Sequence, residues 1–140
     1  MAIAAIDFGR RWIGIAVTDG TALGVYPVET IERRSLKHDL ELICARLAAL
    51  EVTRVIVGLP LNMDGTAGPQ AHAAEAFARQ LHEASGLAVE LFDERLTSFE
   101  AAERMKAIPA RLKRRHPHAS DAVAACVILE SWLQSHARSS

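Results

Sequence analysis

The sequence contains few aromatic residues and few cysteines. Aromatic residues make up only 5% of the 140 residues, which disfavours the base-stacking platform that many single-strand binders use. The two cysteines, Cys44 and Cys126, have no CxxC partner and lie in apolar helical patterns. We therefore expect them to be core residues of a reduced cytosolic protein, and neither metal ligands nor a disulfide.

Long apolar runs and several catalytic signatures are also missing. No run approaches the roughly 20 apolar residues of a membrane span. The N-terminus lacks the basic segment and the longer apolar stretch of a signal peptide, so we expect a cytoplasmic protein with no membrane partner. There is no nucleophile elbow, Walker P-loop, GxGxxG or HExxH motif. These absences disfavour serine hydrolases, P-loop enzymes and dinucleotide-binding enzymes, and no histidine ligand set is present.

The composition is that of one globular domain over residues 1–140, with 50% hydrophobic and 24% charged residues. The net charge of -1 conceals an uneven distribution, because residues 104–120 (the basic segment) hold six Lys or Arg and no acid. Ten basic residues then face seventeen acidic ones in the rest of the chain. A basic segment on an acidic body indicates a local anionic partner, and a solvated charged loop is the alternative.

Hydrophobic periodicity predicts the order β-β-β-α-β-α-β-α-α. The expected strands are 2–6, 12–17, 22–32, 54–58 and 88–92. Three of the expected helices are 35–50, 69–85 and 120–132. A further helix, before the last one, is opened by a Thr97–Glu100 capping box and stopped by Pro109. Pro27 favours an edge position for the third strand. The sequence therefore predicts an α/β fold with a mixed five-stranded sheet of order 3-2-1-4-5, strand 2 antiparallel, flanked by helices.

Acidic residues fall at the ends of the predicted elements. Asp7 follows the first apolar run, Asp93 and Glu94 end the fifth strand, and Asp121 begins the last helix. Parallel strands end at the same edge of an open sheet, where ligand sites form, so we expect these carboxylates to lie together. They would repel one another unless a hard cation such as Mg²⁺ or Mn²⁺ held them. Two such ions could activate a water and stabilise the leaving oxygen of a phosphodiester.

Each acid also has a simpler interpretation. Asp7 and Asp93 can accept hydrogen bonds in turns, Glu94 can pair with Arg95, and Asp121 can complement the helix dipole. Several cations lie near the acids or in the basic segment. We expect the following residues to bind backbone phosphates: Arg10, Arg11, Arg95, Lys113, Arg114 and Arg115. Such contacts give affinity more than sequence preference and weaken as salt rises.

Four stretches resemble the YqgF/RuvX family in order and spacing over almost the whole chain. They are Asp7-x-Gly9-x-Arg11-x-Ile13-Gly14, the loop Gly58–Gly65, Asp93-Glu94-Arg95-Leu96-Thr97, and Asp121-Ala122-x-Ala124-Ala125. The resemblance implies an RNase H-like fold and a bacterial cytoplasmic nuclease, either a Holliday junction resolvase or a processor of small-subunit ribosomal RNA precursor ends.

By position, the resemblance implies that Asp7, Glu94 and Asp121 are the catalytic, metal-binding acids and that Asp93 supports them. Arg11 stands where the family usually has lysine and keeps its charge. Trp12 stands where the family usually has arginine, so one charge beside the site is lost.

The resulting hypothesis is an endonuclease dependent on Mg²⁺ or Mn²⁺ that cleaves structured nucleic acid, in pre-16S ribosomal RNA processing, in Holliday junction resolution or in both. One alternative is a nucleic-acid-binding module of ribosome assembly with weak catalysis. Another is an actin-like phosphotransferase, a fold that normally needs two domains. A junction resolvase needs two sites related by symmetry, which favours a homodimer, and Trp132 and Leu133 lie either in its interface or in the core.

Overall fold

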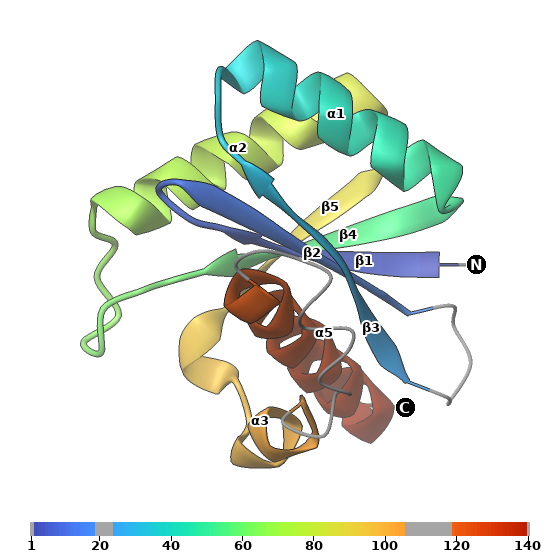
Figure 1. The fold of residues 1–140 in the computed structure, drawn as a ribbon. Coiled ribbons are helices and arrows are strands. Elements are labelled where there is room, and N and C mark those ends of the chain that lie inside the picture. The colour runs from blue at the N-terminus through green and yellow to red at the C-terminus, as the bar shows by residue number, and fades with distance from the viewer. Residues whose placement is uncertain (1, 19–23, 106–118, 140) are drawn as a thin grey trace.

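The computed structural model of the chain describes residues 2–18, 24–105 and 119–139 (Figure 1). Its strands are β1 (Ala2–Phe8), β2 (Trp12–Thr18), β3 (Val25–Glu32), β4 (Val52–Leu59) and β5 (Ala88–Asp93). Its helices are α1 (Leu36–Ala49), α2 (Pro69–Ser85), α3 (Phe99–Met105) and α5 (Ala119–Ser139), with a 3₁₀ turn η1 (Glu94–Leu96).

The five strands form one mixed sheet in the order β3-β2-β1-β4-β5, as the sequence predicts. Strand β1 pairs antiparallel with β2 and parallel with β4, and β5 extends the parallel part on the far side of β4. Strand β3, which contains Pro27, lies at the sheet edge next to β2, where an absent N–H is tolerated. The carboxyl ends of β1, β4 and β5 therefore lie on the same side of the sheet, and we call this side the carboxyl edge.

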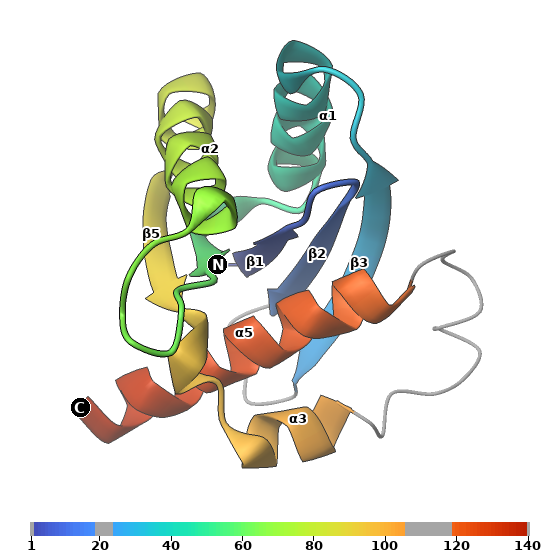
Figure 2. The same ribbon diagram turned by 90° about the vertical axis from the view of Figure 1, so that its left-hand side faces the viewer.

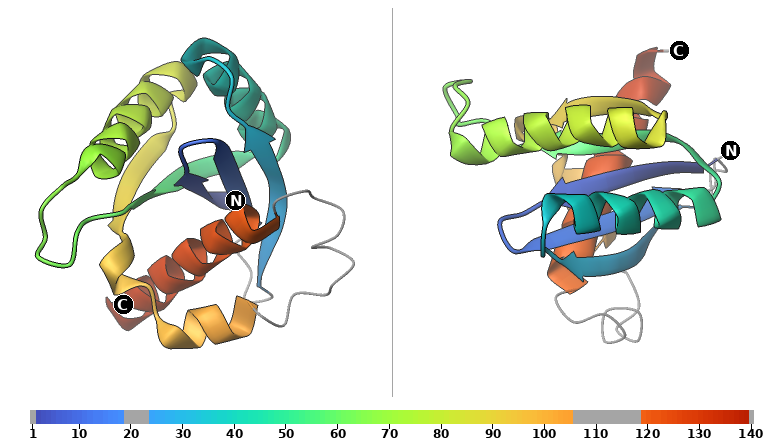
Figure 3. Two further views of the ribbon diagram at one scale, coloured as in Figure 1. Left: turned by 60° about the vertical axis from the view of Figure 1, so that its left-hand side comes forward. Right: turned by 90° about the horizontal axis from the view of Figure 1, so that it is seen from above.

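Helices cover both faces of the sheet. Helices α1 and α2 lie on one face, and α5 crosses the other face, with α3 beside α5 (Figure 2). The two further views show the same layers, with the sheet between α1 and α2 on one side and α5 on the other (Figure 3). Because both faces are covered, β1 is apolar except for Asp7, and β4 is apolar from Val55 onward, as expected for the buried strands of such a sheet.

Each face of the sheet has its own apolar core. One core joins the sheet to α1 and α2 through Leu47 and Phe77, and the other joins it to α5 through Ile56 and Leu129. Trp132 is only 6% exposed in the second core, and Leu133 packs against it, so both are core residues of this chain. Cys126 is buried in this core and Cys44 packs against the other one, which confirms both as core positions.

Helix α1 begins where the sequence predicts, and α2 both begins and ends there. Ser35 caps α1 by accepting a hydrogen bond from His38 N, Pro69 opens α2, and Gly86 closes α2 in the left-handed conformation. The described helices include none that is long and apolar enough to cross a membrane.

The predicted capping box of α3 is wrong by one residue. Ser98 Oγ accepts the hydrogen bond from Ala101 N at 2.8 Å, whereas Thr97 Oγ1 donates to Glu94 O at 2.9 Å. The Thr97 hydroxyl closes η1 and is therefore not the cap of α3. Helix α5 also runs to Ser139, past the predicted end at Trp132, because no Gly or Pro follows Trp132 to stop it.

Candidate active site

Asp7 lies near the carboxyl end of the central strand β1, directly before its last residue, Phe8. It is half-buried between the buried residues Ile6 and Phe8, and it pairs across the sheet with Gly14 of β2. The alternation of a strand turns its side chain away from the face that buries its two neighbours. An acidic side chain thus stands on the central strand at the edge where β1, β4 and β5 end.

Asp121 reaches this edge because Gly14 has no side chain. A Cβ on Gly14 would lie 2.0 Å from Asp121 O, so the first turn of α5 rests directly on the backbone of β2. Gly14 is the pairing partner of Asp7, and this contact places Asp121 next to Asp7. The sequence motif contains Gly14, but only the structure shows that α5 packs directly on its backbone.

Glu94 reaches the same edge across another glycine. Glu94 begins η1 directly after β5, and a Cβ on Gly58 of β4 would lie 3.1 Å from Glu94 Oε2 and 2.6 Å from Ile128 Cδ1. Gly58 therefore leaves room for the carboxylate on one side and for α5 on the other. A glycine inside a strand signals that another part of the chain comes close, but the sequence does not say which part.

The carboxylates influence one another. Burial raises the pKa of Asp7 to about 6, and the negative charge of Asp121 adds to the effect. Burial likewise raises the pKa of Glu94 to about 7, with further contributions from Asp7 and Asp93. Asp7 is therefore coupled to Glu94 on one side and to Asp121 on the other. We refer to Asp7, Glu94 and Asp121 as the carboxylate site.

The chemistry of the carboxylate site suits a hard divalent cation. Its donors are all oxygens, and burial, followed by the neighbouring negative charges, raises the pKa values of Asp7 and Glu94, two effects that a bound cation would offset. Within the described part of the chain, no three His, Cys, Asp or Glu side chains are gathered closely enough to hold an ion. Mg²⁺ commonly takes only one or two carboxylates and completes its shell with water and substrate phosphate, so the pairs around Asp7 fit it.

Asp93 holds Arg95 and, through it, the loop after β4. Asp93 Oδ2 accepts from Arg95 Nη2 at 2.8 Å, and Arg95 Nη1 donates to Met63 O at 3.4 Å. The hydrogen bonds from Arg95 hold the pKa of Asp93 below its usual value. The loop is also braced internally, since Asp64 Oδ1 accepts from Thr66 N at 2.9 Å. Asp93 thus supports the surroundings of Glu94, and the guanidinium of Arg95 bridges two elements beside the carboxylate site.

The other expected phosphate-binding residues lie in two places. Arg10 and Arg11 are exposed in the turn after β1, where Arg11 lies 3.9 Å from Glu32 and its guanidinium is 5.5 Å from the Trp12 ring centroid. The cluster Lys113, Arg114 and Arg115 lies outside the described residues.

The chain matches a family described as "RuvX: Holliday junction resolvase" over residues 1–135. A protein of Anaeromyxobacter sp. (strain K) named "Putative pre-16S rRNA nuclease" is 48% identical over 139 residues, which are 98% of this chain and 99% of that protein. A Myxococcus xanthus protein of the same name is 42% identical over 137 residues, covering 97% of this chain and 89% of that protein.

Solved structures share the fold at low sequence identity. Thermus thermophilus RuvC in complex with Holliday junction substrate has a TM-score of 0.63 at 13% identity, over 97% of this chain and 96% of that one. The fowlpox virus Holliday junction resolvase has a TM-score of 0.54 at 15% identity, over 97% and 99% of the two chains. These likenesses confirm the RNase H-like fold. The family match over residues 1–135 and the relative of 48% identity show that this chain belongs to the RuvX family.

Proposed function

We propose that this chain is a divalent-metal-dependent endonuclease that hydrolyses phosphodiester bonds in structured nucleic acid. The observation that carries the proposal is the position of Asp7 between two other acids, Glu94 and Asp121, at the carboxyl edge of the sheet. Buried like charges are costly unless a cation or a proton neutralises them, and such arrangements are typical of functional sites.

Asp7, Glu94 and Asp121 would hold Mg²⁺ or Mn²⁺. When bound, such ions activate a water and stabilise the leaving oxygen of a phosphodiester. Without a cation, the carboxyl group of Glu94 exchanges its proton near neutral pH, because its pKa is about 7. Asp93 keeps Arg95 beside the site, and we propose that Arg10, Arg11, Arg95 and the cluster Lys113, Arg114 and Arg115 bind backbone phosphates.

The substrate class that we favour is a precursor of 16S ribosomal RNA. The support comes from relatives at 42% and 48% identity, whose names give that substrate. The family description supports a four-way DNA junction as the second candidate, for which a homodimer would supply two symmetric sites. Both substrates present closely spaced phosphates to the basic residues.

Cleavage by the purified protein tests this proposal. The substrates are a structured RNA with a 16S precursor end and a synthetic four-way DNA junction, each with Mg²⁺, Mn²⁺ or EDTA. We expect metal-dependent cleavage of the RNA that Asp7→Asn abolishes while binding is retained. Glu83→Gln, which removes an exposed carboxylate of α2, is the matched control and should cleave normally.

The same experiment separates the alternatives. Cleavage of the junction alone would assign the protein to recombination. Tight binding without cleavage of either substrate would favour the assembly module, and stabilisation of the fold by ATP would favour the phosphotransferase. Loss of binding together with cleavage in Asp7→Asn would contradict the assignment of Asp7 to chemistry.

A further inference from the structure

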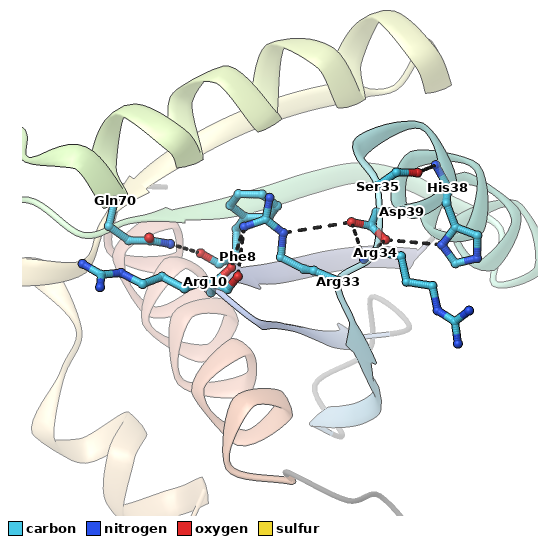
Figure 4. A network of polar contacts seen from close by, with 9 residues as sticks. Phe8, Arg10, Arg33, Arg34, Ser35, His38, Asp39 and Gln70 are labelled. Atoms are coloured by element: carbon cyan, nitrogen blue, oxygen red, sulfur yellow. Dashed lines mark hydrogen bonds and ion pairs between the residues drawn. The ribbon is translucent and has the colours of Figure 1, made fainter.

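The turn that follows Asp7 is held by side chains from two distant parts of the chain (Figure 4). Gln70 Nε2, from the start of α2, donates to Phe8 O at 2.6 Å. Arg33 Nη1, from the connection between β3 and α1, donates to Gly9 O at 3.2 Å and to Arg10 O at 3.3 Å. Successive carbonyl groups of this turn (residues 8–11, the Asp7 turn) are therefore fixed from outside the turn.

Arg33 is itself held in place from two sides. Its guanidinium carbon lies 4.3 Å from the centroid of the Phe8 ring, and that ring stacks on Phe77 of α2 with centroids 4.2 Å apart. Its Nε lies 4.0 Å from Oδ2 of Asp39, whose side chain is only 2% exposed. The guanidinium thus lies between an aromatic face and a buried carboxylate, both of which attract a cation.

This arrangement is not the one that stability alone would favour. Arg33 Nε is buried and has no hydrogen-bond partner among the residues that the structure describes, and an unsatisfied buried donor is costly. Asp39 Oδ1 instead accepts from Arg34 N at 3.0 Å, which fixes the chain where it enters α1. Asp39 lies 3.4 Å from His38 Nδ1 as well. In this network Arg33 Nε makes no hydrogen bond, while the guanidinium stays in contact with the carbonyl groups of the Asp7 turn.

We propose that Arg33 is a positioning residue for the carboxylate site. Through the carbonyls of Gly9 and Arg10 it fixes the Asp7 turn, and through the turn it fixes Asp7 against Glu94 and Asp121. Gln70 holds the same turn from α2, so the two residues act on one structural unit. The catalytic part of this inference rests on the proposed nuclease function.

Arg33→Met keeps an unbranched apolar stem but removes the guanidinium, with its charge, its donors and its contact with the Phe8 ring. Displacing a reactive group by about 1 Å can cost about a hundredfold in rate. We expect kcat to fall by about tenfold to about a hundredfold, with KM changed by less than about threefold. Arg33→Lys keeps the charge but cannot donate to two carbonyls in the same way, so it should recover only part of kcat.

Arg46→Met is the matched control. Arg46 of α1 pairs with Glu29 of β3, so this variant also removes an arginine–carboxylate pair that involves α1, but it does not touch the Asp7 turn. We expect its kcat to stay within about twofold of the original protein. If Arg33→Met and Arg46→Met have the same kcat and the same thermal stability, Arg33 has no positioning role.

A second readout does not depend on cleavage. Gly9 N donates to Trp12 O at 2.9 Å inside the turn, so hydrogen exchange at the Gly9 amide reports whether the turn is closed. We expect faster exchange at Gly9 in Arg33→Met than in Arg46→Met, and weaker Mn²⁺ binding measured by calorimetry without nucleic acid. Unchanged exchange and unchanged Mn²⁺ binding would overturn the inference.

These experiments distinguish a failure of the proposed function from a failure of this inference. If cleavage survives in Asp7→Asn, the nuclease assignment falls, whereas the Gly9 exchange still decides whether Arg33 fixes the turn. If Asp7→Asn abolishes cleavage and Arg33→Met does not differ from Arg46→Met in kcat, Gly9 exchange and Mn²⁺ binding, the nuclease assignment stands and the positioning role falls.

Discussion

Two glycines in the strands set how closely the acids of the carboxylate site approach one another. Gly14 lets the first turn of α5 lie on β2, and Gly58 leaves space for Glu94 and for Ile128. Neither glycine carries chemistry of its own. The space that a Cβ would need at each glycine is occupied by another part of the chain, so any larger residue must displace that part.

Gly58→Ala should both destabilise the fold and lower cleavage. The new Cβ would lie 2.6 Å from Ile128 Cδ1 and 3.1 Å from Glu94 Oε2, and overpacking of this kind typically costs about 1–3 kcal/mol. Urea unfolding measures the loss of stability. The control is Gly68→Ser, where the nearest atoms lie 3.8 Å away and serine is a favourable N-cap for α2, so no loss is expected. Equal stability of both variants would contradict the close approach at Gly58.

Asp7 and Glu94 should make the metal-free protein less stable as pH rises. Their pKa values in the folded protein, about 6 and about 7, exceed the ordinary values of 3.8 and 4.5. Between these limits the folded state binds more protons than the unfolded state, so the free energy of unfolding falls with increasing pH. The stabilising contribution is complete below about pH 4 and is lost as pH passes about 7.

Urea unfolding in EDTA at about pH 5 and about pH 8 tests this prediction, and the double variant Asp7→Asn, Glu94→Gln supplies the background from all other groups. The original protein should lose more stability between the two pH values than the variant, and Mg²⁺ should restore it at the higher pH. A pH dependence identical in both proteins would contradict the coupling of these acids.

At the scale of elements, sequence patterns predicted most of what the structure shows. Short apolar runs predicted the strands, the connections between them predicted their order, helical periodicity predicted α1, and Pro and Gly end signals predicted α2. The positions of Asp7 and Glu94 followed from the strand ends, and that of Asp121 from the start of the last helix. The seat of α5 on Gly14 and the clamp of Arg33 on the Asp7 turn could not be predicted, because both are contacts between residues far apart in sequence.

The capping residue of α3 also could not be identified from the sequence alone. Thr97 and Ser98 are adjacent hydroxyl residues, and the choice of cap depends on η1, which occupies Thr97. Ser98 also contacts α5, since its N donates to Ser131 Oγ at 3.1 Å and its Oγ lies 2.9 Å from Gln134 Oε1.

Ser98→Ala should therefore lower the free energy of unfolding by about 1–2 kcal/mol, through loss of the cap and of the contact to Gln134. Thermal or urea unfolding measures the change. Ser135→Ala, on the exposed side of α5, is the comparison and should cost less. An equal or smaller loss in Ser98→Ala would contradict the assignment of the cap to Ser98.

At the scale of the whole molecule, charge is separated between an acidic body and the basic segment. This separation predicts that nucleic-acid affinity depends strongly on salt. It also predicts that the dependence comes from a few residues, and that changing them leaves the fold intact.

Changing Lys113, Arg114 and Arg115 to Gln should weaken binding and reduce the slope of log K against log salt by about two to about three, if all three residues contact phosphates. The control changes three exposed basic residues elsewhere, Lys37, Arg46 and Arg54, to Gln. Fluorescence anisotropy over a salt series measures both slopes. Equal slopes in the two variants would show that the basic segment is a solvated loop.

The contact between Asp121 and Gly14 joins two segments that lie far apart in sequence. Asp7 is synthesised well before Asp121, and α5, whose first turn contains Asp121, covers β1, β2 and β3. A nascent or truncated chain that lacks α5 thus has an open sheet face and only two of the three acids. On the proposed function, the carboxylate site is completed only once α5 has been synthesised, so we expect chains that stop before α5 to leave nucleic acid uncleaved.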